Sequence, residues 1–207
     1  MGSRCRAHRC CCRWWRRGTS LMTTVRLVRH GQASAGWGID PDPDLDDLGR
    51  SQAEAVAARL DDLVGEATPE VWTSPLLRCR NTAEPFRQRR GVEALVKEAV
   101  REIPSPLGMA TSERADWLRS AMDGTWSDLG GEFVAFRDHL VERIATIEHD
   151  TVVFSHFIAI NAIIGACNGD DRLVIRTLDN TSITTVDVTD GILTLVEGGA
   201  EADTIIR

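Results

Sequence analysis

The sequence predicts an α/β fold, a three-layer sandwich in which helices cover both faces of a mostly parallel central sheet. Two observations predict it. Short apolar runs typical of buried strands alternate along the chain with segments whose apolar residues recur at helical spacing. Near the C-terminus, two apolar runs are separated only by Asp190-Gly191, which favours an antiparallel hairpin at one edge of the sheet. With 207 residues in the chain and 43% hydrophobic content, residues 23–207 fit a single domain.

Residues 1–22 are expected to lie outside this fold as a disordered basic extension. The first twenty residues hold six arginines and no acidic residue, whereas the whole chain has a formal charge of −7. They also hold four of the six cysteines, in a spacing that matches no paired metal motif. Neither a nucleic-acid-binding arm nor a zinc site is favoured. One explanation for the extension is a start codon assigned upstream of Met22.

The composition indicates in which compartment the protein occurs and which classes of partner it lacks. No apolar stretch approaches the roughly 20 residues that span a bilayer. No apolar stretch of about 7–15 residues follows the arginines, as it would in a secretory signal. Beyond the extension, Cys79 and Cys167 are the only cysteines, which is not a disulfide framework. We therefore expect a cytoplasmic protein without membrane or nucleic-acid partners. Whether it forms a homodimer is left open.

The first predicted elements are a strand, a loop and a helix. Residues 25–28 form an apolar run typical of a short buried strand. Residues 34–45 are rich in Gly, Pro and Asp and are expected to form a loop. Asp46 is suited to cap the N-terminus of the following helix, and Gly65 to end it. Between them, apolar residues recur at helical spacing: Leu48, Val56, Leu60 and Leu63.

The middle of the chain predicts a second strand, a second helix and a cap. Residues 71–73 are the strand, and Ser74-Pro75 combines an N-cap residue with proline at the first helical position. The helix is expected to end or kink at Pro85, because a proline in a helix interior removes a hydrogen bond. Residues 93–103 hold a further predicted strand, and residues 104–126 a partly helical cap segment.

The last part of the chain completes the sheet. Residues 131–149 carry an amphipathic stripe of apolar residues, which predicts a helix. Residues 151–154 form another buried strand, and His156 lies where the next helix begins. Residues 183–188 and 192–196 are the two strands of the predicted hairpin.

Polar side chains follow three of the predicted strands. Arg29 and His30 follow the first, Arg78 lies just after the second, and His156 follows the strand at 151–154. Because the carboxyl ends of parallel strands meet at one edge of a sheet, we expect these side chains to lie together. Helices that begin there add unpaired N–H groups and the positive end of the helix dipole. The predicted site therefore suits a small, dense anion such as phosphate.

Several motifs in the same order make the chain resemble the histidine phosphatase superfamily, which includes the cofactor-dependent phosphoglycerate mutases. They are Arg29-His30-Gly31, residues 48–53, residues 73–78, Arg101-Glu102-Ile103, residues 154–156 and residues 180–184. The resemblance covers nearly all of residues 23–207. It implies that His30 is the phosphorylated nucleophile and Glu102 the proton donor. It also implies that Arg29, Arg78 and His156 hold the phosphoryl group.

The chemistry of these residue types agrees with the implied roles. A neutral His30 can form a phosphohistidine, while the two arginines and a protonated His156 stabilise the equatorial oxygens of the transferred group. Glu102 needs a raised pKa to protonate the leaving oxygen at neutral pH. Glu98 is the alternative proton donor. No metal ion or other cofactor is required.

Further substrate contacts are expected from residues close to the histidine. Together with the two arginines they are Gly31, Gln32, Ser34 and Trp37. Asn180 and Ser182 could line the rim of the pocket, although polar residues before a strand are ordinarily turn formers. The substrate itself is expected to be a small phosphate ester.

The residues after Gly31 favour a phosphatase over a mutase. The mutases that the chain resembles read Arg-His-Gly-Glu followed by Thr or Ser, with Asn four places after that Glu. The corresponding positions here are Gln32, Ala33 and Gly36, so an amide and a hydroxyl that order phosphate are missing. We expect a metal-independent, acid-type phosphatase that hydrolyses a small phosphate monoester. Mutase-type transfer, a phosphohistidine-protein phosphatase, a metal hydrolase and a non-catalytic phospho-ligand binding module are the alternatives.

The leaving group of that monoester is expected to be uncharged or apolar. Apolar contacts are available from Trp37, Met109, Trp117 and Trp126, unless the tryptophans fill the core. Acidic residues of the loop at 34–45 would repel a polyanionic substrate if they faced the pocket. They are Asp40, Asp42 and Asp44.

Overall fold

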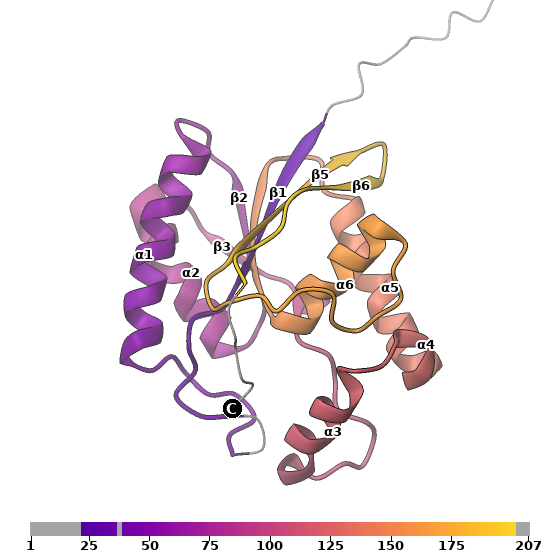
Figure 1. Ribbon diagram of the computed structural model, residues 1–207. Coiled ribbons are helices and arrows are strands. Elements are labelled where there is room, and N and C mark those ends of the chain that lie inside the picture. Colours follow the sequence, from indigo (N-terminus) through magenta and orange to yellow (C-terminus); the bar gives the residue numbers. More distant parts are fainter. Residues whose placement is uncertain (1–21, 37–38, 202–207) are drawn as a thin grey trace, which may run out of the picture.

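The computed structural model of the chain describes residues 22–36 and 39–201. Its strands are β1 (Thr23–Arg29), β2 (Glu70–Thr73), β3 (Ala94–Val96), β4 (Thr151–Ser155), β5 (Ile183–Thr189) and β6 (Ile192–Glu197). They form a six-stranded sheet in the order β3-β2-β4-β1-β5-β6 (Figure 1). Most of the predicted N-terminal extension, residues 1–22, lies outside the described residues.

The sheet is mostly parallel. Strand β4 is parallel to both β1 and β2, and β2 is parallel to β3. Strand β5 is antiparallel to β1, and β6 is antiparallel to β5 at the edge of the sheet. Asp190 and Gly191 join β5 to β6 with φ angles of 52° and 78°, the positive values that a tight hairpin turn requires. The predicted antiparallel edge hairpin is confirmed.

Helices cover both faces of the sheet, as predicted. They are α1 (Asp47–Val64), α2 (Leu77–Arg90), α3 (Arg114–Ala121), α4 (Trp126–Leu129), α5 (Gly131–Ala145) and α6 (Phe157–Asn168), with short 3₁₀ turns at Glu98–Val100 and Thr111–Glu113. Helices α1 and α2 lie on one face and α5 and α6 on the other, while α3 lies beyond the carboxyl ends of the parallel strands (Figure 1). None of the helices in the described ranges is long and apolar enough to cross a membrane.

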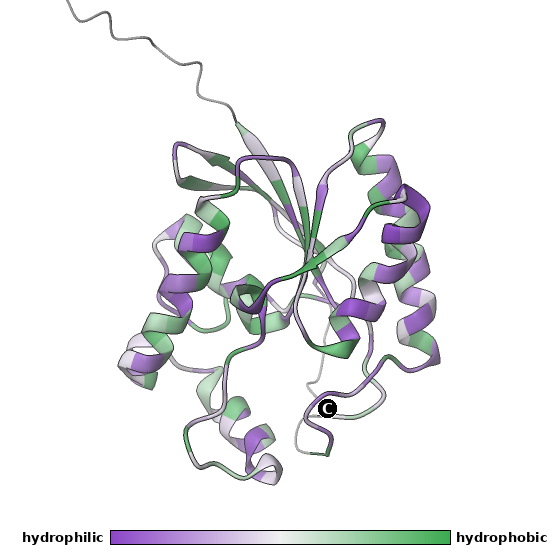
Figure 2. Cartoon of the chain, turned by 180° about the vertical axis from the view of Figure 1, so that it is seen from behind, coloured by the Kyte–Doolittle hydropathy of each residue, from purple (hydrophilic) through white to green (hydrophobic). Residues whose placement is uncertain are grey.

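Each face of the sheet has its own hydrophobic cluster. Val56, Leu60 and Phe86 pack against the sheet on the side of α1 and α2. On the other side, helix α6 is buried from Phe157 through Gly165, and in Figure 2 hydrophobic residues (green) are frequent in the helices on this side of the sheet. Burying each large apolar side chain contributes about 1.5–3 kcal/mol. The two clusters hold β1, β2 and β4 rigidly, and these strands carry the site.

Helix α1 has the predicted caps but a different buried face. The Asp46 carboxylate accepts a hydrogen bond from the Gly49 N–H at 2.7 Å, and Gly65 ends the helix. Two of the four leucine and valine positions expected to face the core, Leu48 and Leu63, are exposed. The buried face instead combines Val56 and Leu60 with three smaller residues: Gly49, Ala53 and Ala57.

Helix α2 corrects two expectations. It begins at Leu77 rather than at Pro75, because the backbone at Leu76 is still extended. It also continues through Pro85 to Arg90, so the predicted end or kink at Pro85 is wrong. The adjacent Phe86 is fully buried. Packing of this face against the core outweighs the roughly 3 kcal/mol that an interior proline costs.

The segment after β2 is more irregular than expected. The strand predicted over residues 93–103 is limited to Ala94–Val96, and a 3₁₀ turn follows before Glu102. Residues 104–126 are partly helical, as predicted, and contain helix α3. Trp126, at the end of this segment, is buried in the core.

Candidate active site

The ends of β1, β2 and β4 lie side by side. The His30 N–H donates to the Ser155 carbonyl at 3.0 Å, and the Ser74 N–H donates to the Phe154 carbonyl at 3.0 Å. These backbone bonds continue the parallel pairing one residue past the strands. They bring His30 and His156 together, with ring centroids 5.3 Å apart.

His30 is held in one tautomer. Its Nδ1 lies 2.7 Å from the Gly31 carbonyl oxygen, which can only accept a hydrogen bond, so Nδ1 carries the proton. Its Nε2 accepts a hydrogen bond from Nε of Arg78 at 3.2 Å. The Asn180 amide donates to the His30 carbonyl at 3.0 Å and fixes the backbone. The geometry leaves a lone pair on Nε2.

His156 is held in the opposite tautomer. Arg78 donates to its Nδ1 from Nη2 at 3.2 Å, and a guanidinium has no lone pair to offer in return. The proton of His156 is therefore on Nε2, which lies 2.7 Å from the hydroxyl oxygen of Ser74. Arg78 thus contacts an unprotonated nitrogen on each of the two histidines.

Both imidazoles are neutral in this arrangement. Burial lowers the pKa of His30 well below its usual value, and the positive charges of Arg78 and Arg29 lower it further. Burial and then Arg78 lower the pKa of His156 in the same way. The neutral His30 agrees with the sequence-based expectation. The protonated His156 does not, because desolvation and the neighbouring guanidinium both oppose its charge.

Arg29 lies buried beneath the site. Its guanidinium packs over the ring of Phe157 at 5.1 Å, and Nη1 donates to the Leu178 carbonyl at 2.5 Å. Its Nε has no hydrogen-bond partner among the described residues. Desolvation lowers the pKa of Arg29 to about 10, partly opposed by the charges of Glu102 and Asp179. Arg29 therefore stays positively charged at neutral pH.

Glu102, rather than Glu98, lies at the site. The Glu102 side chain is 3% exposed, and its Oε1 accepts the Ile103 N–H at 3.0 Å. Its Oε2 is buried without a hydrogen-bond partner among the described residues. Burial raises the pKa of Glu102, against the opposing influence of the Ile103 N–H and Arg78. Glu98 is exposed and pairs with Arg101 at 3.6 Å.

A cavity of about 240 Å³ lies beside two of these groups, Arg78 and Glu102, whereas His30, His156 and Arg29 do not line it. Its wall includes residues of the loop at 39–45 and of the cap segment. The other lining residues are Asp40, Pro41, Pro43, Leu76, Arg101, Ile103, Pro104, Ser105, Met109, Thr111 and Arg114. The cavity therefore lies between Arg78 and the cap segment.

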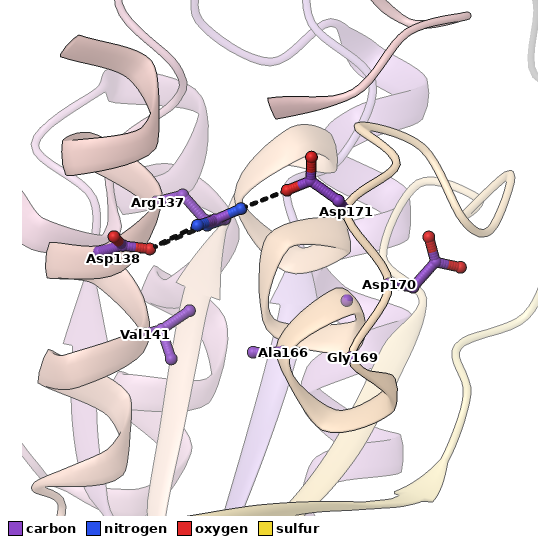
Figure 3. A pocket seen from close by; sticks show the side chains of 8 residues that line it. Arg137, Asp138, Val141, Ala166, Gly169, Asp170 and Asp171 are labelled. Atoms are coloured by element: carbon purple, nitrogen blue, oxygen red, sulfur yellow. Dashed lines mark hydrogen bonds and ion pairs between the residues drawn. The ribbon is translucent and has the colours of Figure 1, made fainter. Parts of the chain in front are cut away.

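A larger cavity of about 290 Å³ lies elsewhere, between α5 and the end of α6. In Figure 3, Arg137 on its wall points between two carboxylates. The guanidinium contacts Asp138 at 2.8 Å and Asp171 at 2.5 Å. The charge of Arg137 is thus already paired. This cavity shares no residue with the candidate active site.

The predicted contacts close to His30 have mainly structural roles. Gly31 is buried against α1, where a Cβ atom would lie 2.7 Å from the Gly49 carbonyl oxygen. The Gln32 amide donates to the Asp46 carboxylate at 2.7 Å, on the helix N-cap. Ser34 is exposed, and Trp37 lies outside the described residues.

Two acidic residues of the loop and two tryptophans are used differently from what was expected, whereas Asp40 lines the cavity. Asp42 accepts the Leu77 N–H at 2.8 Å, and Asp44 pairs with Arg50 at 2.8 Å, so both fix the loop. Among the expected apolar contacts, Met109 lines the cavity. Trp126 is in the core and Trp117 packs on Phe133, with ring centroids 5.6 Å apart.

A family comparison agrees with this geometry. A model of the histidine phosphatase superfamily (branch 1) matches residues 25–199. The chain belongs to the histidine phosphatase superfamily. The match covers β1 with the nucleophile candidate, the segment with Glu102 and the strand that precedes His156. No significant match was found among curated proteins.

Solved structures of similar fold include enzymes of two kinds. A mycobacterial hydrolase has 23% sequence identity and a TM-score of 0.65, over 88% of this chain and 100% of its own. A mycobacterial glucosyl-3-phosphoglycerate phosphatase in complex with inorganic phosphate has 22% identity and a TM-score of 0.63, over 86% and 98%. A phosphoglycerate mutase from Bacillus anthracis has 16% identity and a TM-score of 0.64, over 86% and 93%. At these identities the likeness establishes the fold of this histidine phosphatase superfamily member.

Several residues of the site were missed or misinterpreted in the sequence. Ser74 was expected to cap a helix, but its hydroxyl contacts His156. Thr82 accepts the Gly31 N–H at 2.9 Å and was not considered at all. Ser182, for which a place at the pocket rim was one possibility, is buried and does not line the cavity. The signal for Thr82 was its place one helical turn after Arg78.

Proposed function

We propose that the chain is a phosphomonoesterase that hydrolyses a small phosphate monoester through a phosphohistidine on His30. The observation that carries this proposal is the tautomer of His30. Its proton is held at Nδ1 by the Gly31 carbonyl, so the lone pair on Nε2 is directed toward Arg78. A nucleophilic nitrogen beside a guanidinium is suited to attack a phosphorus atom whose oxygens that guanidinium binds.

The first half of the reaction forms the phosphoenzyme. Nε2 of His30 attacks phosphorus in line, a N–P bond forms and the ester P–O bond breaks. The Glu102 carboxyl gives its proton to the departing oxygen, which leaves as an alcohol. Arg78 and Arg29 stabilise the charge on the equatorial oxygens. The positive charge that develops on the imidazole is stabilised by the Gly31 carbonyl through Nδ1–H.

The second half returns the enzyme to its starting form. The Glu102 carboxylate takes a proton from water as the water oxygen attacks phosphorus. The N–P bond breaks, inorganic phosphate leaves, and His30 is again neutral with its proton on Nδ1. The raised pKa of Glu102 supports both roles, since it brings the acid and base forms of this carboxyl closer to neutral pH.

Hydrolysis is favoured over transfer to a second substrate by the segment after Gly31. Gln32 stands where the mutases have Glu, and its amide is bonded to Asp46 at the N-cap of α1. It is therefore not free to order a phosphoryl group or an acceptor.

Arg29 and Arg78 supply positive charge, so we propose that no metal ion takes part. The described cysteines, Cys79 and Cys167, are free thiols, which supports a reducing compartment such as the cytoplasm.

The proposal is tested by trapping the phosphoenzyme. The protein is mixed with p-nitrophenyl phosphate at mildly acidic pH and quenched rapidly, and the modified residue is mapped by mass spectrometry. We expect phosphate on His30, no turnover in His30→Ala, and unchanged turnover in excess chelator. The matched control is His139→Ala, because His139 is exposed on α5. Full activity of His30→Ala would overturn the mechanism, and transfer of phosphate to an added alcohol in preference to water would indicate a mutase.

A further inference from the structure

We propose that the cavity contains a second anion site at Arg114, so that the leaving group of the substrate carries a carboxylate. Arg114 is the first residue of α3, in the cap segment, and lines the same cavity as Arg78 and Glu102. This inference rests on the proposed phosphatase function, and it names the class of ester that the site accepts.

The guanidinium of Arg114 is partly buried and held by neutral groups. Nη2 donates to the Ile103 carbonyl at 2.6 Å, and Nη1 donates to the Ser105 hydroxyl at 2.5 Å. These bonds fix the guanidinium beside the strand-end segment that carries Glu102. A guanidinium has five N–H donors, so others remain for a planar, bidentate anion.

The positive charge of Arg114 has no carboxylate partner within 4 Å among the described residues, although other surface arginines do. The nearest acidic influence on its pKa is Glu102, and desolvation outweighs it. Glu102 cannot act as the permanent partner, because burial favours its neutral form and because it must donate its proton in the reaction. A partly desolvated charge without a partner is unfavourable, and a bound anion would compensate it.

Among the other charged residues of the cavity wall, Asp40 is the only carboxylate besides Glu102 and forms no ion pair with Arg114, and Arg101 is itself a cation. Arg101 is exposed and already pairs with Glu98 at 3.6 Å. Asp40 is exposed at the opposite wall, and its Oδ1 accepts the Asp42 N–H at 2.9 Å. Arg114 is thus the cation best placed to receive an anionic group inside the cavity.

The position of Arg114 also distinguishes its ligand from the transferred phosphoryl group. That group must lie at Nε2 of His30, where Arg78 contacts both histidines. Arg114 lies next to Ile103, just beyond the carboxyl that protonates the leaving oxygen. An anion at Arg114 therefore belongs to the leaving group. This differs from the uncharged or apolar leaving group expected from the sequence: of the apolar contacts named there, Met109 lines the cavity, whereas Trp117 and Trp126 do not.

The test compares two esters that differ in one group. 2-Phosphoglycolate carries a carboxylate where ethyl phosphate carries a methyl group. We expect kcat/KM of the wild-type protein to be at least about tenfold higher for 2-phosphoglycolate, the size of a charge-assisted hydrogen bond. In Arg114→Gln this ratio should fall about tenfold, and Arg114→Lys should restore part of it. Arg119→Gln, on the same helix with an exposed arginine, should leave the ratio unchanged.

A binding measurement separates this inference from the proposed function. 3-Phosphonopropionate and propylphosphonate are non-hydrolysable isosteres of the two esters, and calorimetry gives their Kd values without turnover. A tenfold preference for the carboxylate that disappears in Arg114→Gln supports the anion site even if neither ester is hydrolysed. Equal affinity for both phosphonates, or a preference that Arg114→Gln retains, overturns the site even if His30 is phosphorylated.

Discussion

The Ser74 hydroxyl oxygen lies 2.7 Å from Nε2 of His156, and both side chains are buried. Because Arg78 occupies the other ring nitrogen as a donor, the hydroxyl of Ser74 must accept the proton of Nε2. Ser74 thus fixes the tautomer of a histidine on a different strand. Cys79, whose sulfur is 3.3 Å from the same nitrogen, is the only other described side chain near enough to contribute.

Replacing Ser74 with alanine should release the tautomer of His156. We expect kcat/KM to fall by about tenfold, the cost of one buried hydrogen bond in the transition state. We also expect the pH profile of kcat to shift, because His156 loses the neutral hydroxyl that accepts its proton. Steady-state kinetics across pH measure both effects. Ser51→Ala is the control, since Ser51 is exposed and its hydroxyl donates to the Asp47 carbonyl within α1. An unaltered pH profile in Ser74→Ala would contradict this role.

The sequence predicted those residues of the site whose side-chain chemistry is distinctive and which follow directly after a parallel strand. Arg29, His30 and His156 could be placed together because each follows a parallel strand, and a sheet brings such ends to one edge. Ser74 could not be assigned to His156, because its short-range pattern equally fits a helix cap. The contact depends on how β2 and β4 are positioned relative to each other, and a local sequence pattern does not specify that.

The errors in the fold have a similar origin. The prediction at Pro85 used the local cost of proline, but the burial of Phe86 beside it is a tertiary effect. In α1, the spacing of Leu48 and Leu63 identified a helix correctly, but small residues turn toward the sheet because the helix packs closely there. Helical periodicity predicts that one side of the helix is apolar, but it does not specify which residues of that side face the sheet.

Replacing Glu102 with glutamine should remove the acid catalyst and stabilise the fold at high pH. The folded protein raises the pKa of this carboxyl by burial, so its neutral form is favoured and stability is lost as pH rises above the unfolded value of 4.5. Glu102→Gln should therefore melt at a higher temperature than wild type at pH about 8, and not below pH about 4.

The same variant should lower kcat by roughly 10²–10⁴ for alkyl phosphates, whose leaving groups need a proton, and by less for p-nitrophenyl phosphate. Glu98→Gln is the control, because Glu98 is exposed. An equal loss for both classes of ester would argue against a role in protonating the leaving group.

The close contact between Gly31 and Gly49 should not tolerate a larger residue. A Cβ on Gly49 would lie 2.1 Å from the Gln32 carbonyl oxygen, and a backbone atom cannot move aside cheaply. We expect Gly49→Ala to destabilise the protein by about 1–3 kcal/mol and to lower kcat by displacing the backbone next to His30. Urea unfolding and steady-state kinetics measure these changes. Gly131→Ala, where a Cβ meets nothing within 4 Å, should keep wild-type stability or exceed it.

The two buried histidines should make the protein sensitive to mild acid. Their pKa values in the folded protein lie well below 6.5 because of burial and Arg78, so the unfolded chain binds more protons. Their contribution to stability is present above pH about 6.5 and is lost as pH falls through that value. Paired surface carboxylates such as Asp44, whose pKa is lowered from 3.8, act only at lower pH. Glu102 acts in the opposite direction over this range, so the test compares variants. Between pH about 7 and 5, the urea midpoint of His30→Asn should lose less, or gain more, than that of the wild type, and the exposed control His139→Asn should not differ from wild type. An identical change in His30→Asn would mean that the pKa of His30 is the same in the folded and the unfolded protein, and would contradict the desolvated, neutral nucleophile proposed here.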